Sequence, residues 1–71
     1  MINQNLIIIP TYQESENISD LIEAIFSLAL PFEILIVDDN SSDGTAQIVK
    51  TKQEIYPETL HLIQRPKKMG L

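Results

Sequence analysis

The segment FEILIVDDNSSDG, residues 32–44, decides the fold of this 71-residue chain. Its first six residues form an almost continuous apolar run, which is typical of a short strand buried on both faces of a parallel sheet. The seven residues after it are polar or glycine and predict a loop. We therefore expect a buried strand over residues 32–37, with the carboxylates of Asp38 and Asp39 at its carboxyl end.

A second apolar run lies upstream, at residues 6–9, and Pro10 follows it. It predicts another strand buried on both faces, which ends at the proline because that residue has no N–H for a sheet ladder. Apolar residues then recur every three or four positions and predict a helix that begins near Ile18 and cannot pass Pro31. Ser15 or Asn17 is its predicted N-cap. The apolar face of this helix consists of Ile18, Leu21, Ile22, Ile25 and Ala29.

The same alternation continues downstream of the opening segment. Ser42 or Asp43 is positioned to cap a helix over residues 45–55, which Pro57 ends. Residues 60–63 predict a third short strand, and residues 64–71 predict a loop. The order β-α-β-α-β predicts an α/β fold, in which right-handed crossovers join parallel strands into an open sheet with helices on its faces.

Polar loops follow the first two predicted strands, at residues 10–14 and 38–41. Ligands of open parallel sheets bind outside the carboxyl ends of the strands, so we expect these loops to lie side by side and to form the site. Asp39 offers an acceptor for the N–H of a nucleobase or for a ribose hydroxyl. Tyr12 offers an aromatic face for stacking, and Glu14 offers further acceptors.

Each of these residues also has a purely structural interpretation. Neighbouring side chains at a strand end point in opposite directions, so Asp38 and Asp39 are expected to differ in role, one of them stabilising the loop. Alternatively, both carboxylates only form an Asx-turn into the second helix. Tyr12 can equally cover the core, and Glu14 can be a first-turn residue favoured by the helix dipole. His61, without a second His, Ser or Cys arranged around it, is interpreted as an ordinary strand residue.

The composition, with 44% hydrophobic and 21% charged residues, is that of a soluble globular domain. The absence of cysteine excludes disulfides and thiolate chemistry and is compatible with a reducing cytoplasm. We expect no signal peptide, and no membrane span, because the apolar stretches are far below the roughly 20 residues required. A chain this short buries only about 60% of its unfolded surface, so stable folding is expected to need more chain.

The formal net charge is -5, and all five basic residues lie at or after Lys50. The acidic balance argues against nucleic-acid binding. The basic tail of Arg65, Lys67 and Lys68 has two interpretations: contact with a phosphate or an anionic membrane surface, or a solvated loop. Neither G-x-G-x-x-G nor G-x-x-x-x-G-K-[ST] occurs, which disfavours dinucleotide or Walker-type binding.

Three ordered motifs resemble those of a known family: IIIPTYQESENI at residues 7–18, EILIVDDNSSDGTA at 33–46 and RPKKMGL at 65–71. Together they are similar to the family 2 glycosyltransferases of GT-A fold, and within these to the polyprenol (dolichol) monophosphate mannose synthases. The implied fold is the Rossmann-like, nucleotide-binding N-terminal portion of GT-A. One position departs from the family, which usually has Asn where this chain has Gln13, and the longer amide displaces its donor and acceptor groups.

The resemblance implies that Pro10, Tyr12, Glu14, Val37 and Asp39 contact the nucleotide of a sugar donor. For the intact protein it implies an enzyme that transfers mannose from GDP-mannose to polyprenyl (dolichyl) phosphate, with inversion, at the cytoplasmic face of a membrane. It also implies a divalent cation, Mg²⁺ or Mn²⁺, whose ligands lie beyond Leu71, and membrane association only through other regions or the acceptor. Residues 1–71 are then expected to be the N-terminal part of one glycosyltransferase domain, without catalytic residues and inactive alone.

Three other functions stay open at this point. A family 2 transferase could use a UDP-sugar and another acceptor, since Asp39 can accept from the N–H of uracil as well as of guanine. EILIVDDN is also similar to the strand of a response-regulator receiver that carries an acidic Mg²⁺-binding pair. Here, however, a full βα unit precedes the pair, and the third strand ends without a phosphoacceptor aspartate. The last alternative is a non-enzymatic remnant or interaction module.

Overall fold

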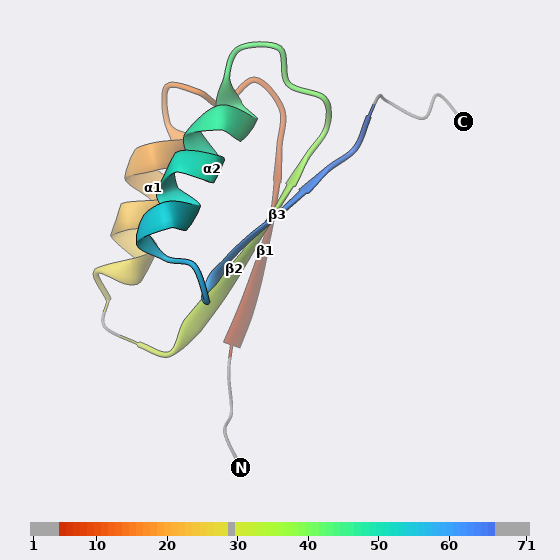
Figure 1. Cartoon of the computed structure of the whole chain (residues 1–71). Coiled ribbons are helices and arrows are strands. Elements are labelled where there is room, and N and C mark those ends of the chain that lie inside the picture. Colours follow the sequence, from red (N-terminus) through yellow and green to blue (C-terminus); the bar gives the residue numbers. More distant parts are fainter. Residues whose placement is uncertain (1–4, 29, 67–71) are drawn as a thin grey trace.

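A computed structural model describes residues 5–28 and 30–66 of the chain. Within these residues three strands alternate with two helices (Figure 1). The elements are β1 (Asn5–Thr11), α1 (Ile18–Phe26), β2 (Phe32–Asp38), α2 (Thr45–Ile55) and β3 (Leu60–Gln64). The predicted order β-α-β-α-β is therefore confirmed. Neither described helix is long and apolar enough to cross a membrane.

The three strands form a parallel sheet in the order β1-β2-β3. Both helices lie on the same side of this sheet, to the left of the strands in Figure 1. The core lies between the helices and that face of the sheet. Its fully enclosed members are Ile18, Ile22, Ile34, Ile36, Val49 and Leu60. Burial of one such aliphatic side chain contributes about 1.5–3 kcal/mol, so this layer supplies most of the driving force for folding.

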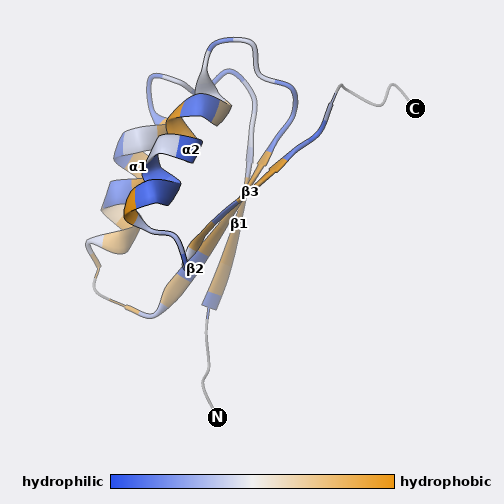
Figure 2. Ribbon diagram, in the orientation of Figure 1, coloured by the Kyte–Doolittle hydropathy of each residue, from blue (hydrophilic) through white to orange (hydrophobic). Residues whose placement is uncertain are grey.

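The opposite face of the sheet is not covered by either helix. On it the side chains of Leu6, Ile8 and Ile63 are 54%, 60% and 50% exposed. Figure 2 shows that the strands are nevertheless predominantly hydrophobic along their length. The prediction that β1 is buried on both faces is therefore wrong for the described residues. The residues of β2 on this face are half-buried, and the helices predicted on the faces of the sheet lie on one face only. An apolar run shows that a strand is suited to burial, but it does not show that the chain itself provides the cover.

Pro10 lies inside β1, although the sequence predicted that the strand would end before it. The carbonyl of Thr11 accepts the N–H of Asp39 at 2.9 Å, so the backbone groups of Thr11 face β2. Backbone groups of adjacent strand residues face opposite sides, which directs those of Pro10 to the outer edge of the sheet. Its missing N–H therefore removes no hydrogen bond to β2, and the strand continues.

The start of α1 and both ends of α2 match the prediction, but the end of α1 and the caps do not. Asn17 occupies the N-cap position of α1 without a capping side-chain bond, and α1 ends at Phe26, well before Pro31. The last residue of the predicted apolar face, Ala29, lies outside the described residues. The N-cap of α2 is Gly44, whose φ of 94° lies in the left-handed region that glycine adopts without strain. One predicted cap contributes nonetheless, because the carboxylate of Asp43 accepts the N–H of Thr45 at 3.1 Å.

The two helices are joined at their far ends by a small polar and aromatic cluster. Glu23 of α1 accepts hydrogen bonds from the ammonium of Lys52 at 2.7 Å and from the hydroxyl of Tyr56 at 2.8 Å. The ring of Tyr56 stacks on Phe26 with 4.2 Å between centroids. These contacts fix α1 against α2 at the end of the molecule opposite the polar loops (Figure 1).

Candidate functional site

The two polar loops meet at the carboxyl edge of the sheet, as the topology predicts. The first loop, residues 12–17, joins β1 to α1, and the second loop, residues 39–44, joins β2 to α2. The N–H of Gln13 donates to the hydroxyl of Ser41 at 2.8 Å, and the side-chain carbonyl of Gln13 accepts the N–H of Ser42 at 2.7 Å. The N–H of Glu14 donates to the hydroxyl of Thr45 at 2.9 Å. The prediction that these loops lie side by side is confirmed.

Asp38 is buried at this edge and serves the loops. It is 1% exposed and accepts the hydroxyls of Thr11 at 2.7 Å and Ser41 at 2.6 Å, together with the N–H of Ser41 at 2.9 Å. Burial alone would raise the pKa of Asp38, but the hydrogen bonds from Ser41 and Thr11 outweigh it and hold this pKa below its ordinary value. The carboxylate is therefore an ionised anchor between β1 and the second loop.

Asp43 is a second anchor, at the start of α2. Its carboxylate accepts the N–H of Ser15 at 3.0 Å from the first loop and the N–H and hydroxyl of Thr45 from its own side. The bond from the Thr45 hydroxyl is the main reason that the pKa of Asp43 falls from 3.8 to about 2. Three consecutive amides of the first loop, those of Gln13, Glu14 and Ser15, thus each donate to a side chain that follows β2.

Asp39, the next residue after Asp38, has a different environment. Its N–H is bonded to the carbonyl of Thr11, which fixes the backbone, while its side chain is 32% exposed. The carboxylate atom Oδ1 is buried and has no hydrogen-bond partner among the described residues. The Nε of Arg65 lies 3.7 Å from Oδ1, close enough for an ion pair but too far for a hydrogen bond. An acceptor of this kind is suited to a donor group supplied by a ligand.

Three further predicted site residues, Tyr12, Pro10 and Val37, lie near Asp39 along the ends of β1 and β2. Tyr12 directly follows Thr11, and its side chain is 61% exposed, so one face of its ring is accessible for stacking. Pro10 and Val37 are partners in the β1–β2 register, and Val37 in turn pairs with Ile63 of β3. Residues at alternate strand positions share a face, which places the side chains of Pro10 and Val37 on the uncovered face of the sheet, at its carboxyl end.

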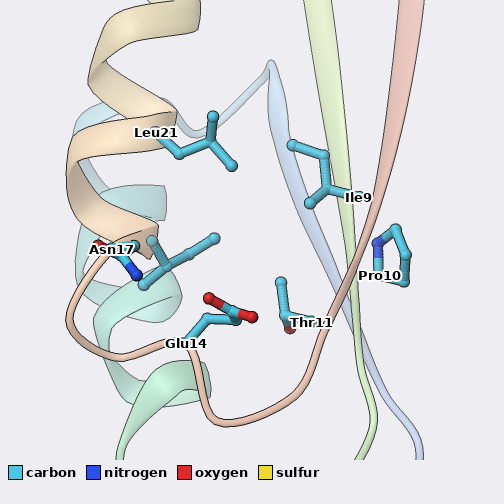
Figure 3. A pocket seen from close by; sticks show the side chains of 7 residues that line it. Ile9, Pro10, Thr11, Glu14, Asn17 and Leu21 are labelled. Atoms are coloured by element: carbon cyan, nitrogen blue, oxygen red, sulfur yellow. The ribbon is translucent and has the colours of Figure 1, made fainter.

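Glu14 lies on the other side of β1. A pocket of about 210 Å³ opens between β1 and α1, and the Glu14 side chain extends into it beside Asn17 (Figure 3). The pocket is lined by Ile9, Pro10, Thr11, Glu14, Asn17, Ile18 and Leu21. Tyr12, Val37 and Asp39 do not line it, and the pocket is smaller than the roughly 300 Å³ at which small-molecule sites begin. The five predicted residues thus share one edge of the sheet but form two groups, which Pro10 connects.

The described residues do not provide a metal site. Within residues 5–28 and 30–66 no group of three or more His, Cys, Asp or Glu side chains is arranged to hold a metal ion. Asp38 and Asp43 already accept hydrogen bonds on both carboxylate oxygens. The expected divalent cation therefore finds no matching set of ligands in this part of the molecule.

Sequence reasoning did not assign two residues of this region. Arg65, predicted only as part of a basic tail, is brought to Asp39 because its N–H donates to the carbonyl of Asp38 at 2.8 Å. Lys67 and Lys68 of the same tail lie outside the described residues. Gln13 has a φ of 56°, in the left-handed region, and its side chain bonds the second loop. For Gln13 the sequence offered one indication, the presence of Gln where the resembled family usually has Asn. For Arg65 it offered the position directly after β3, the strand that neighbours β2.

Comparison with known proteins adds a family relationship. A family model described as glycosyl transferase family 2 matches residues 6–71. The chain is 35% identical over 68 residues to a polyprenol monophosphomannose synthase of Mycolicibacterium smegmatis, an alignment that covers 96% of this chain and 26% of the relative. It is 38% identical over 61 residues to the glycosyltransferase AglE of Haloferax volcanii, which covers 82% of this chain and 20% of that protein.

A solved structure has the same arrangement of elements. The mannosyltransferase PcManGT from Pyrobaculum calidifontis, determined in complex with GDP-Man and Mn²⁺, superposes with a TM-score of 0.80 and 30% sequence identity. The match covers 93% of this chain and 20% of that one. The chain thus spans about a quarter or less of the length of the relatives it matches.

Proposed function

The chain belongs to glycosyl transferase family 2, and from this we propose that it forms the donor-nucleotide side of a mannosyltransferase. The carrying observation is the carboxylate of Asp39, whose buried Oδ1 has no hydrogen-bond partner among the described residues at the edge where ligands of parallel sheets bind. Such an acceptor suits a base that presents a ring N–H, as guanine and uracil do.

The neighbours of Asp39 fit the flat remainder of a nucleoside. The exposed ring of Tyr12 is available to stack on the base, and Pro10 with Val37 provides an apolar floor beside it. Glu14, in the pocket on the other side of β1, is assigned to an outer part of the nucleotide. Pro10, Tyr12, Glu14, Val37 and Asp39 are therefore the proposed contact residues.

For the whole protein we propose transfer of mannose from GDP-mannose to a lipid-linked phosphate such as polyprenyl phosphate. Two relatives support this choice: the synthase of Mycolicibacterium smegmatis by its name, and the Pyrobaculum calidifontis enzyme by its bound GDP-Man. The manganese in the latter structure supports a divalent cation, held in our proposal by residues outside this chain. A lipid-linked acceptor places the reaction at a membrane, for which we propose the cytoplasmic face. The 71-residue chain alone is expected to transfer no sugar.

A titration of the isotope-labelled chain followed by NMR tests this proposal. GDP and UDP are added separately, and acetyl phosphate with Mg²⁺ serves as the probe for a receiver. We expect the amide signals of Tyr12, Val37 and Asp39 to shift with GDP, more weakly with UDP, and not with acetyl phosphate. Tighter binding of UDP would instead favour a UDP-sugar donor. Formation of a phosphoaspartate, or no response to either nucleotide, would contradict the proposed function.

A further inference from the structure

Among residues 5–28 and 30–66, Arg65 is the cation that pairs with Asp39. It follows β3 directly, and its N–H donates to the carbonyl of Asp38 at 2.8 Å, which extends the β2–β3 ladder by one bond. Its backbone is thereby fixed next to the residue that precedes Asp39. The side chain then needs only to turn across the end of β2 for its Nε to reach 3.7 Å from Oδ1 of Asp39.

The pairing compensates an arrangement that is otherwise unfavourable. A buried carboxylate oxygen without a hydrogen bond loses the hydration it would have in the unfolded chain. A guanidinium close by restores part of that interaction through its charge, while the distance of 3.7 Å keeps it outside hydrogen-bond range. Oδ1 therefore keeps its capacity to accept a hydrogen bond. Asp38, by contrast, has its acceptors occupied by Thr11 and Ser41.

We propose that Arg65 is a positioning residue of the nucleotide site, which holds the carboxylate of Asp39 oriented toward the ring N–H of the base. This inference rests on the proposed function, because it names a further residue of the same site. Its side chain is 47% exposed, so the contribution of the pair is moderate rather than large. Arg65 acts on the nucleoside through Asp39, and the phosphates of the ligand are not required.

An alternative role for the same guanidinium is direct contact with a phosphate of the nucleotide. The two roles differ in which ligands they affect. If Arg65 acts through Asp39, its removal weakens the binding of guanosine and of GDP by the same factor. If it contacts a phosphate, its removal weakens the binding of GDP and leaves the binding of guanosine unchanged.

The experiment measures the dissociation constants of guanosine and GDP by NMR titration for four chains: wild type, Arg65→Gln, Asp39→Asn and the double variant. We expect Arg65→Gln to weaken both ligands by roughly two- to fivefold, the range of a partly exposed ion pair. In the Asp39→Asn background the same substitution should change neither constant. Arg65→Lys, which keeps the charge and loses the planar group, should restore part of the affinity.

Lys50→Gln is the matched control, because it also removes one positive charge but from the exposed surface of α2. It should leave both dissociation constants unchanged. A two-dimensional NMR spectrum of each variant shows whether it is folded. If Arg65→Gln is not folded, the comparison is made with Arg65→Lys instead. Equal affinity of wild type and Arg65→Gln, or a loss confined to GDP, overturns the inference and leaves the proposed function standing. Absence of any binding by the wild-type chain overturns both.

Discussion

The hydroxyl of Thr11 donates a hydrogen bond of 2.7 Å to the carboxylate of Asp38, and this bond joins the carboxyl ends of β1 and β2 inside the protein. The two residues are partners in the strand register and are 4% and 1% exposed. Replacement by Thr11→Val keeps the shape and removes the donor. We expect it to lower the free energy of unfolding by about 1–2 kcal/mol, because a buried acceptor loses one of its partners.

Urea denaturation measures this change, with Thr51→Val as the matched control. The hydroxyl of Thr51 also donates a hydrogen bond, in this case to the backbone carbonyl of Gln47 on the exposed side of α2. Its substitution should alter stability by less than about 0.5 kcal/mol. Equal effects of the two substitutions would show that the buried bond to Asp38 does not stabilise the sheet edge.

Substitution of the adjacent residues Asp38 and Asp39 by Asn should affect different properties, stability in the first case and nucleotide binding in the second. Asp38→Asn replaces one of the two acceptor oxygens by an NH₂ group, so the side chain can no longer accept all three hydrogen bonds from Thr11 and Ser41, and we expect a loss of stability of about 1–3 kcal/mol. Asp39→Asn removes the charge of a carboxylate whose Oδ1 has no hydrogen-bond partner in the described residues. We therefore expect the free energy of unfolding to change by less than about 1 kcal/mol. Binding of GDP should weaken by about five- to tenfold, since a hydrogen bond to a charged acceptor becomes one to a neutral acceptor.

Paired urea denaturation and GDP titration of the two variants separate these effects. A destabilised Asp39→Asn with unchanged GDP affinity would remove Asp39 from the proposed contacts. Unchanged stability of Asp38→Asn would mean that the bonds from Thr11 and Ser41 do not hold the loops.

Stability should fall in acid, and Asp43 should account for part of the loss. Its pKa is lowered from 3.8 to about 2 in the folded chain, chiefly by the hydrogen bond from Thr45, so folding favours its ionised form. The stabilisation from Asp43 is therefore complete above about pH 4 and is lost as the pH falls toward 2. Asp38, whose pKa is also lowered, changes in the same direction.

Urea denaturation at a series of pH values between 7 and 2 measures this dependence. The Asp43→Asn variant should be less stable than wild type at pH 7 and should approach wild-type stability near pH 2. Glu54→Gln removes one exposed negative charge from α2 and serves as the control, since it leaves Asp43 in place. A constant difference between Asp43→Asn and wild type at every pH would contradict the assigned role.

The two faces of the sheet should differ in their sensitivity to truncation. Ile36 of β2 is 0% exposed on the covered face, while Ile8 of β1 is 60% exposed on the uncovered face. Ile36→Ala should cost about 2–5 kcal/mol and Ile8→Ala less than about 1 kcal/mol, because only the first leaves a cavity in a packed layer. Thermal or urea denaturation of both variants tests this. A large cost for Ile8→Ala would show that the uncovered face is buried in solution.

Most of the architecture could be predicted from local patterns. Proline, glycine, continuous apolar runs and the apolar spacing of three and four residues predicted where the elements lie, and most of their ends moved by no more than two residues, while α1 ends at Phe26, three residues before Ala29. The side of the sheet on which each helix packs could not be predicted in this way. It depends on two crossovers that run in the same direction, so that α1 and α2 share a face.

In the site, likewise, some features could be predicted from the local sequence, and others depend on contacts between residues far apart in the chain. Asp38 and Asp39 are conspicuous in sequence, and their different environments follow from the alternation of a strand. Pro10 was predicted to end β1 because its missing N–H was expected to face a partner, and only the sheet order shows that it faces the edge. Arg65 reaches Asp39 through a hydrogen bond between the end of β3 and β2, a contact that no local pattern contains.

The hydrogen bonds that three consecutive backbone N–H groups donate from the first loop to the second loop and the start of α2 constrain changes in the length of the first loop. The N–H groups of Gln13, Glu14 and Ser15 each meet a different acceptor, on Ser41, Thr45 and Asp43. Insertion or deletion of one residue before Gln13 would shift all three N–H groups away from their acceptors. A substitution at one acceptor, by contrast, removes a single hydrogen bond. We therefore expect variation in the first loop to be confined to side chains, and under the proposed function a change of base preference would arise through a new residue at Tyr12 while the spacing to Asp39 stays fixed.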